Sequence, residues 1–402
     1  MQRRQFLGLG AAVSASLLLG SPALAQTPAG AMRFVWINLR GAVDGLHTVF
    51  PTLDPDFGGQ RKSLLASVER ELLPLANGFA LHPELKTLHA WFREKTLSPV
   101  VAVASPYRER SHFAAQDVLE SGQSPANAAD GWLARALAGS GLAGNSGLAI
   151  ARSVPVVLRG DQTAQTWYPS SLPPADLDLY QRLLSLYAED ETLHARLQEG
   201  MSTRASLEMN DAEPAELRRP TLASLGRACG EMLAENPSLR GATLEMGGWD
   251  THSQQVPRLN QQFRQLDAGL AALRTGLGNA WATTVIAIGT EFGRTVAVNG
   301  TGGTDHGTGS VMFLTGGAMA GGSVLGDWPG LGKAALLDGR DLRPTSDVRE
   351  WLAGALQRAW GLDENALQRV FPGVKPRSSK AWRSPARTAR ASQRLLASPA
   401  SA

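Results

Sequence analysis

The chain has 402 residues, of which 43% are hydrophobic, so it is long enough to form one large core or a core with a sizeable insertion. Its single cysteine, Cys229, excludes an internal disulfide, and packing alone must stabilise the fold. The net charge of +3 does not indicate a basic domain, because residues 375–402 carry seven Lys or Arg and no acidic residue.

The first 25 residues have the features of a cleavable twin-arginine signal peptide. Arg3-Arg4 precedes Phe6-Leu7 and an apolar stretch over residues 7–19 that is too short to span a bilayer comfortably. Ala23-Leu24-Ala25 forms a small-x-small cleavage site. The residues flanking the arginines depart from the usual pattern, so an ordinary secretory signal is the alternative. We expect export to the periplasm or otherwise out of the cytoplasm, with the Tat translocase as a partner.

Residues 26–374 alternate short apolar, β-prone runs with longer helical patterns. This order predicts an α/β domain with a mostly parallel central sheet and helices on both faces. Several runs are continuous, as is typical of central strands buried on both faces. The expected strands are 34–39, 100–104, 154–158, 243–246, 284–288 and 311–314, and the expected helices are 83–94, 113–120, 132–137, 254–277 and 348–360.

Residues 174–236 show a different pattern, with leucines at helical spacing, many charges and no strand-like run. We expect a helical insertion or cap here.

Polar residues gather directly after the predicted strands, where α/β sheets usually place functional side chains. Asp44 follows the first strand, and Ser111 and His112 follow the second. Further acids and imidazoles follow the later strands: Asp250, His252, Glu291, Asp305 and His306.

Such a set predicts a divalent metal site, because carboxylates neutralise the ion and imidazole prefers zinc, manganese or iron over calcium. Each residue alone has an ordinary structural explanation. Asp44 fits a turn, Asp250 fits a helix N-cap, and His112 and His306 fit buried structural histidines. The convergence of several loops favours the metal site.

Ser111 lies where a loop enters an amphipathic helix, so N-capping is its structural explanation. Free backbone N–H groups at a helix start also attract an anion such as phosphate or sulfate. Beside a metal, the Ser111 oxygen could become a nucleophile. Arg40, Arg110 and Arg294 are candidate clamps for that anion.

Six sequence motifs occur together behind the Tat-like signal: LRGAVDGL, LHPEL, RSHFAAQDVLESG, MGGWDTH, TEFGRT and GGTDHG. From about residue 33 to residue 362 the chain thereby resembles the domain-of-unknown-function family 1501. That family is similar to the alkaline phosphatase and sulfatase superfamily. The resemblance implies an alkaline phosphatase-like α/β sandwich with a metal site of one or two ions.

The resemblance also implies roles for individual residues. Asp44 corresponds to the carboxylate after the first strand, and Ser111 to the nucleophile. Asp250 and His252 correspond to the Asp and His that hold the first metal. The spacing Asp-Thr-His is narrower than the Asp-x-x-x-His of the superfamily, which makes His252 the weaker match.

Glu291 takes the place of the Asp in an Asp-His pair, and His306, fifteen residues later, matches the last metal histidine. Phe292 stands where the superfamily has the His of that pair, so the second metal position lacks a ligand. We therefore expect one tightly held metal rather than an equal pair. Asp305-His306 offers a second alignment, as the Asp-His pair itself.

The leading hypothesis is an exported metal-dependent hydrolase or transferase that acts on a phosphate or sulfate ester. Its nucleophile is Ser111 or a water held by the metal, and Arg110 or Arg294 holds the anion. Its cofactor is one or two divalent ions: zinc, manganese or magnesium. The competing hypothesis is a non-catalytic envelope protein that uses a degenerate metal site for binding.

The basic segment 375–402 is rich in Ser, Ala and Pro and has too little apolar content to fold alone. We expect a disordered tail that contacts an anionic envelope surface. Export makes nucleic acid an unsuitable partner.

Overall fold

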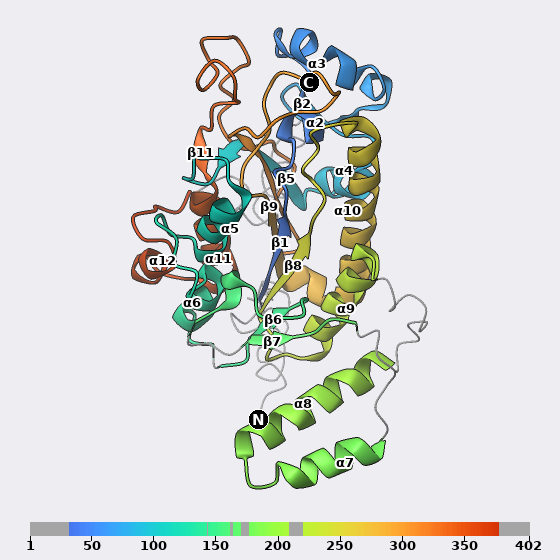
Figure 1. Ribbon diagram of the computed structural model, residues 1–402, viewed down its shortest axis with the longest axis vertical. Helices are drawn as coiled ribbons and strands as arrows, with labels where there is room; N and C mark the ends of the chain where they lie inside the picture. Colours follow the sequence, from blue (N-terminus) through green and yellow to red (C-terminus); the bar gives the residue numbers. More distant parts are fainter. Residues whose placement is uncertain (1–31, 143, 161–163, 170–176, 209–219, 378–402) are drawn as a thin grey trace, which may run out of the picture.

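The structure is a computed structural model that describes residues 32–377, apart from residue 143 and the ranges 161–163, 170–176 and 209–219 (Figure 1). The predicted signal peptide and nearly all of the predicted tail lie outside the described residues.

A central eight-stranded sheet, in the order β11-β5-β10-β9-β1-β8-β6-β7, forms the middle of the molecule (Figure 1). Every neighbouring pair is parallel except the two pairs made by β10. The predicted mostly parallel α/β sheet is therefore confirmed. The strands are β1 (Arg33–Leu39), β5 (Leu97–Ala104), β6 (Gly147–Ala149), β7 (Ala164–Thr166), β8 (Gly241–Met246), β9 (Thr284–Gly289), β10 (Ser310–Thr315) and β11 (Ser346–Asp347).

A small antiparallel sheet lies beside one end of the central sheet. It consists of β2 (Val49–Pro51), β3 (Leu73–Pro74) and β4 (Phe79–Leu81), with β4 in the middle. Short helices α2 (Gly45–Thr48) and α3 (Phe57–Leu65) lie at the same end (Figure 1).

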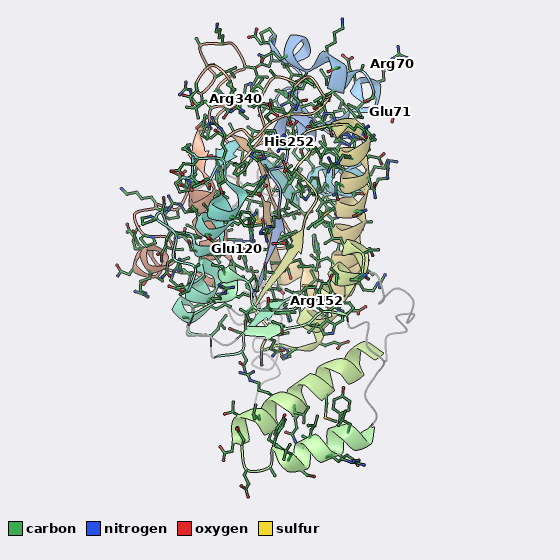
Figure 2. The ribbon with its side chains drawn as sticks, viewed as in Figure 1. Arg70, Glu71, Glu120, Arg152, His252 and Arg340 are labelled. Atoms are coloured by element: carbon green, nitrogen blue, oxygen red, sulfur yellow. The ribbon has the colours of Figure 1, made fainter. Side chains whose placement is uncertain are left out.

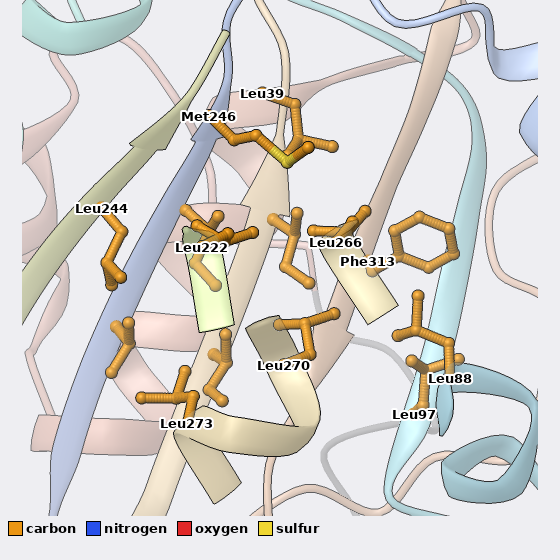
Figure 3. Packing of buried hydrophobic residues seen from close by; sticks show 14 of the residues in the cluster. Leu39, Leu88, Leu97, Leu222, Leu244, Met246, Leu266, Leu270, Leu273 and Phe313 are labelled. Atoms are coloured by element: carbon orange, nitrogen blue, oxygen red, sulfur yellow. The ribbon is translucent and has the colours of Figure 1, made fainter. Parts of the chain in front are cut away.

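Helices cover both faces of the central sheet and enclose two separate apolar cores (Figure 1). Figure 3 shows the first core, in which leucines of the helices pack on Leu39, Met246 and Phe313 of the strands. The helices on this face are α4 (Lys86–Arg93), α9 (Leu222–Glu235) and α10 (Gln255–Leu277), and those on the other are α5 (His112–Ser121), α6 (Trp132–Gly139), α11 (Val348–Trp360) and α12 (Glu364–Val370).

One predicted strand is wrong. Residues 154–158 do not join the sheet, and Val156–Leu158 forms a 3-10 helix. Pro155 precedes this turn, and the Val157 N–H donates to the Glu120 carboxylate at 3.1 Å instead of to a strand. An apolar run with a proline at its start can be buried equally well as a turn, because burial depends on side chains and not on strand pairing.

The range 174–236 is helical in its described part, but it does not form one unit. Helices α7 (Leu177–Leu186) and α8 (Glu191–Glu208) form a hairpin that lies apart from the sheet in Figure 1. Helix α9 instead packs along α10 and buries Leu225, Cys229 and Leu233 in the first core. The helical stretch therefore includes one integral helix of the α/β domain.

The domain extends slightly into the predicted tail. Arg377 forms ion pairs with Asp327 at 2.7 Å and with Glu350 at 3.6 Å, and its guanidinium lies over the Trp351 ring. Arg377, which belongs to the segment predicted as a tail, therefore contacts the α/β domain. Within the described residues, no helix combines the length and apolar character needed to cross a membrane.

Candidate metal centre

Three imidazoles and one carboxylate meet at the edge of the sheet where β5, β8 and β9 end. The Nε2 atom of His306 lies 3.0 Å from Nε2 of His112 and 3.0 Å from Nε2 of His252. The Asp250 carboxylate lies 3.2 Å from His306 Nε2, 3.0 Å from His252 Nε2 and 3.5 Å from His112 Nε2. We call these four residues the imidazole cluster. Figure 2 shows His252 toward the end of the molecule that carries α2 and α3.

The other ring nitrogen of each histidine faces an acceptor outside the cluster. The Nδ1 of His112 lies 2.7 Å from the Glu291 carboxylate, and the Nδ1 of His252 lies 3.2 Å from the Asp305 carboxylate. The Nδ1 of His306 lies 3.0 Å from the Arg110 carbonyl, at a residue whose backbone is left-handed (φ +60°). These acceptors favour the tautomer that carries its proton on Nδ1.

With their protons on Nδ1, the three neutral rings direct Nε2 lone pairs at one another. Lone pairs about 3 Å apart repel, and one added proton can bridge only one pair of nitrogens. A cation between them removes the repulsion. Metal-binding histidines typically donate the other ring N–H to a carboxylate or carbonyl, and here all three Nδ1 atoms face such an acceptor.

The spacing of the donor atoms suits a metal ion. Bonds of about 2.0–2.1 Å in a tetrahedral arrangement place ligand atoms about 3.3 Å apart, close to the separations in the cluster. A metal site in a protein usually needs at least three His, Cys, Asp or Glu side chains close together. Among the described residues, one group meets this condition: His112, Asp250 and His306. A set of imidazoles with one carboxylate suits zinc or iron better than magnesium.

Glycines let the loops of the cluster approach one another. At Gly303, an added Cβ would lie 2.3 Å from the His252 carbonyl carbon. At Gly41, where φ is +122°, it would lie 2.8 Å from the Asp250 nitrogen. A side chain at either position would push apart the segments that carry the ligands.

Arg294 fixes the Asp250 carboxylate. Its guanidinium, which is fully buried, donates to Asp250 Oδ1 at 2.6 Å and also to the Thr304 carbonyl. Partial burial would raise the pKa of Asp250, but the hydrogen bond and charge of Arg294 outweigh it and hold that pKa below its usual value. Arg294 therefore keeps Asp250 ionised and oriented, and its guanidinium is not free to clamp an anion as we expected.

The histidines differ in their affinity for a proton. The Glu291 hydrogen bond raises the pKa of His112, whereas burial and the nearby His112 charge lower the pKa of His306. Burial would raise the pKa of Glu291, but hydrogen bonds, first among them that of His112, hold it below its usual value. In the metal-free protein, His112 therefore takes up an added proton before His306 does.

Asp44 does not join the cluster. Its buried carboxylate accepts from Arg61 at 2.5 Å, from Gln255 at 2.6 Å and from the backbone N–H groups that begin α2. Burial would raise the pKa of Asp44, but the Arg61 charge and hydrogen bond outweigh it and lower that pKa. Its charge is neutralised within the protein, so the carboxylate is not available as the metal ligand that we expected.

Glu291 and Asp305 lie behind the ligands rather than among them. Glu291 is buried and also accepts from the Gly41 N–H and the Thr290 hydroxyl. Asp305 is about half exposed and also accepts from Asn299. Both orient imidazoles, whereas the sequence had suggested direct metal ligands.

Arg110 and Ser111, which we also expected to act on substrate, differ in their availability. Arg110 donates to the buried Asp341 at 2.8 Å, so its charge is shared within the protein, although its side chain is about one-third exposed. Ser111 is exposed at the start of α5, and its hydroxyl makes no capping hydrogen bond. The Ser111 hydroxyl therefore remains available for a ligand at this helix end.

Phe292 fills the space beside the cluster. Its buried ring lies 4.9 Å from the His112 ring and 5.3 Å from the His306 ring, measured between centroids. An apolar ring in this position, together with the neutralisation of Asp44 by Arg61, fits one metal better than two.

From the sequence, we placed His112 in the set that predicted a metal site but did not assign it as a ligand, and we did not single out Arg61 at all. His112 adjoins Ser111 and follows the end of a predicted strand. This position after a strand is the same feature that pointed to the residues assigned as metal ligands. Arg61 lies in α3, 17 residues from Asp44, and nothing in that spacing indicated their ion pair.

Comparison with known proteins agrees with the sequence motifs. The family model described as "Protein of unknown function (DUF1501)" matches residues 90–371, well over half of the chain. No curated protein matches the sequence. The chain therefore belongs to the DUF1501 family.

Proposed function

We propose that this protein is an exported, metal-dependent hydrolase or transferase that acts on a phosphate or sulfate ester. One observation carries the proposal: the Nε2 atoms of His112, His252 and His306 converge on Asp250, while their Nδ1 atoms are already committed elsewhere. Such a site suits a cation, and its partial exposure leaves room for a substrate.

His112, Asp250 and His306 would hold the metal in this proposal. A divalent ion there would polarise an ester oxygen and lower the pKa of a nearby hydroxyl or water. Glu291 holds the His112 ring in place, and Arg294 holds the Asp250 carboxylate. The Phe292 ring excludes water from one side of the site.

Two further features suit an anionic ester. The Ser111 hydroxyl and the first backbone N–H groups of α5 lie beside His112 in the chain, and a helix start attracts phosphate or sulfate. Arg340 donates to the His306 carbonyl at 2.8 Å. It shares Asp341 with Arg110, at 3.2 Å, but is the more exposed of the two arginines, at about 40%, so it supplies part of a positive charge near the cluster. Arg340 replaces Arg294 as our choice for an anion contact.

We assign His252 to proton transfer at the open side of the site. It is the most exposed of the three histidines, at 46%, and its Nδ1 faces the half-exposed Asp305. An exposed imidazole backed by a carboxylate can accept a proton from a nucleophile and return it to the leaving group.

The proposal is tested by metal analysis of purified protein, followed by turnover of 4-nitrophenyl phosphate and 4-nitrophenyl sulfate. We expect about one metal per chain and hydrolysis of at least one ester. Ser111→Ala should abolish turnover and retain the metal, and Leu53→Ala, an exposed site elsewhere, should change neither. Metal binding without turnover of either ester would refute the enzyme.

The second candidate function is non-catalytic metal-dependent binding in the cell envelope. Phe292 favours it, because an apolar ring occupies the place where the alkaline phosphatase superfamily has a ligand of its second metal. Turnover that disappears with the metal and returns when the metal is restored would exclude this candidate.

Export by the Tat pathway and contact of the tail with an anionic envelope surface complete the proposal. Replacing Arg3-Arg4 with Lys-Lys should block export, because a lysine cannot reproduce the paired guanidinium groups. Fractionation of cells checks this. Unchanged periplasmic yield of the Lys-Lys variant would contradict the Tat route.

A further inference from the structure

A second polar site lies between α5 and the sheet, on the face opposite the α9–α10 pair. It is a pocket of about 370 Å³, within the range of about 300–1,000 Å³ typical of small-molecule sites. Strands β1 and β8 form its floor, where Trp36 pairs with Thr243 and Asn38 pairs with Glu245. We call it the α5 pocket.

The walls of the α5 pocket contain polar groups that lack partners. Trp36, Asn38 and Gln116 line it, and each is at least 96% buried. The Asn38 amide donates to Gln116 Oε1 at 2.8 Å, but the Trp36 Nε1, Asn38 Oδ1 and Gln116 Nε2 atoms have no hydrogen-bond partner in the structure. Two donors and one acceptor therefore remain unsatisfied, a costly arrangement beside an apolar ligand.

The charges of the pocket disfavour an anion, because acidic side chains outnumber basic ones in its lining. Asp117, Glu120 and Glu245 contribute three carboxyl groups. The two cations of the lining are Arg40, which is paired with Glu245 at 3.4 Å, and Arg159, which donates to the Val154 and Ala128 carbonyls. Glu120 is buried and accepts from Val157, and burial raises its pKa to about 6. A neutral ligand with hydroxyl groups suits these walls, because each hydroxyl both donates and accepts.

The aromatic ring of Phe113 forms part of the pocket lining. The side chain of Phe113 is 77% exposed. No other phenylalanine among the described residues is as exposed. The CH-rich face of a sugar ring can pack on such a ring while its hydroxyls reach polar walls. Phe113 follows His112 directly in the chain. Arg40 precedes Gly41, whose N–H donates to the same Glu291 carboxylate that His112 contacts. Two short chain segments therefore connect the pocket with the imidazole cluster.

We propose that the α5 pocket binds the neutral, hydroxyl-rich part of the substrate, a sugar or similar polyol, while its anionic ester group faces the imidazole cluster. The assignment of the ester group rests on the proposed function. The acidic walls orient the substrate, because they repel the phosphate or sulfate from the pocket toward the cationic site.

Binding of neutral sugars by the full chain tests the pocket without relying on catalysis. Methyl α-glucoside, methyl α-galactoside and methyl α-mannoside are titrated into wild-type protein and followed by ligand-observed NMR. At least one should bind, and Phe113→Ala and Gln116→Leu should each weaken that binding at least fivefold. Leu53→Ala, which replaces another exposed apolar side chain, is the matched control and should leave it unchanged.

The outcomes separate the two proposals. Sugar binding that is sensitive to Phe113→Ala, without turnover of either aryl ester, keeps the pocket and refutes the enzyme. Turnover without binding of any of the three glycosides overturns the pocket and keeps the enzyme. Sugar binding that is unaffected by Phe113→Ala also overturns the pocket proposal. Because Phe113 is exposed, its replacement is not expected to impair folding.

Discussion

Asp44 and Asp250 both follow parallel strands at the same edge of the sheet, yet their surroundings differ sharply. Asp44 is 1% exposed and is neutralised by Arg61, which is equally buried. Asp250 is 42% exposed and faces three imidazoles on one side and Arg294 on the other. One carboxylate is part of the protein interior, and the other remains open to a ligand.

The difference comes from the segments that pack against each strand end. Helix α3 directs Arg61 at Asp44, and Gln255 at the start of α10 closes the remaining side. Around Asp250, the neighbouring loops instead bring neutral imidazoles whose Nδ1 atoms are occupied. Each carboxylate is therefore paired with a buried arginine, and Asp250 differs in being 42% exposed and in having imidazole nitrogens beside its oxygens.

The largest expected effect tests the buried ion pair of Asp44 and Arg61. Arg61→Met leaves the Asp44 carboxylate buried without its cation, and removing one partner of a buried pair typically costs about 3–5 kcal/mol of folding free energy. Urea unfolding of metal-free protein measures the loss. The double variant Arg61→Met with Asp44→Asn should recover part of it. If Arg61→Met instead lowered metal affinity without affecting stability, Asp44 would belong to the metal site.

The next largest expected effect tests the exposed site around Asp250. His306→Ala removes the ring that contacts both other histidines, so we expect metal affinity to fall at least about 100-fold, equivalent to about 2.7 kcal/mol. Metal titration measures the loss, with His89→Ala on α4 as a control outside the cluster. Thermal stability should fall only when metal is present. An equal loss of stability in metal-free protein would mark His306 as structural.

Much of the fold followed from the sequence, because continuous apolar runs report burial on both sides of a strand. The runs at 34–39 and 284–288 appear as β1 and β9 in the centre of the sheet. The three-residue strands β6 and β7 escaped notice, since pairing at the sheet edge needs few apolar side chains. The apolar run at 154–158 shows the opposite error. We took its burial as evidence of a strand, but it does not pair with any strand of the sheet.

The site was predictable in membership but not in roles. Asp250, His252 and His306 were chosen from their positions after strands or in glycine-rich loops, and the structure brings them together. The roles of Glu291 and Arg294 depend on which atom faces which neighbour, over sequence separations of 179 and 44 residues. Spacing along the chain carries no information of that kind.

Glu120 extends the comparison to a buried carboxyl group that forms no ion pair with any of the described residues. Burial raises its pKa to about 6, whereas Arg61 lowers that of Asp44. The folded protein therefore binds a proton that the unfolded chain has already released, and stability falls as pH rises from about 4.5 to about 6. The expected contribution is about 2 kcal/mol. Urea unfolding across this pH range should show that fall in wild type and a smaller one in Glu120→Gln.

The smallest expected effect compares the two carboxylates that lie behind histidines. Glu291 is fully buried and holds His112 at 2.7 Å, so Glu291→Gln should weaken metal binding about 10–100-fold, as is typical when such a partner is lost. Asp305 is 53% exposed and lies 3.2 Å from His252, so water can replace it, and Asp305→Asn should weaken binding less than about threefold. Metal titration of the two variants decides the point. Equal losses would show that His252 is held as firmly as His112, and would make it a fourth metal ligand rather than the proton-transfer group of an open site.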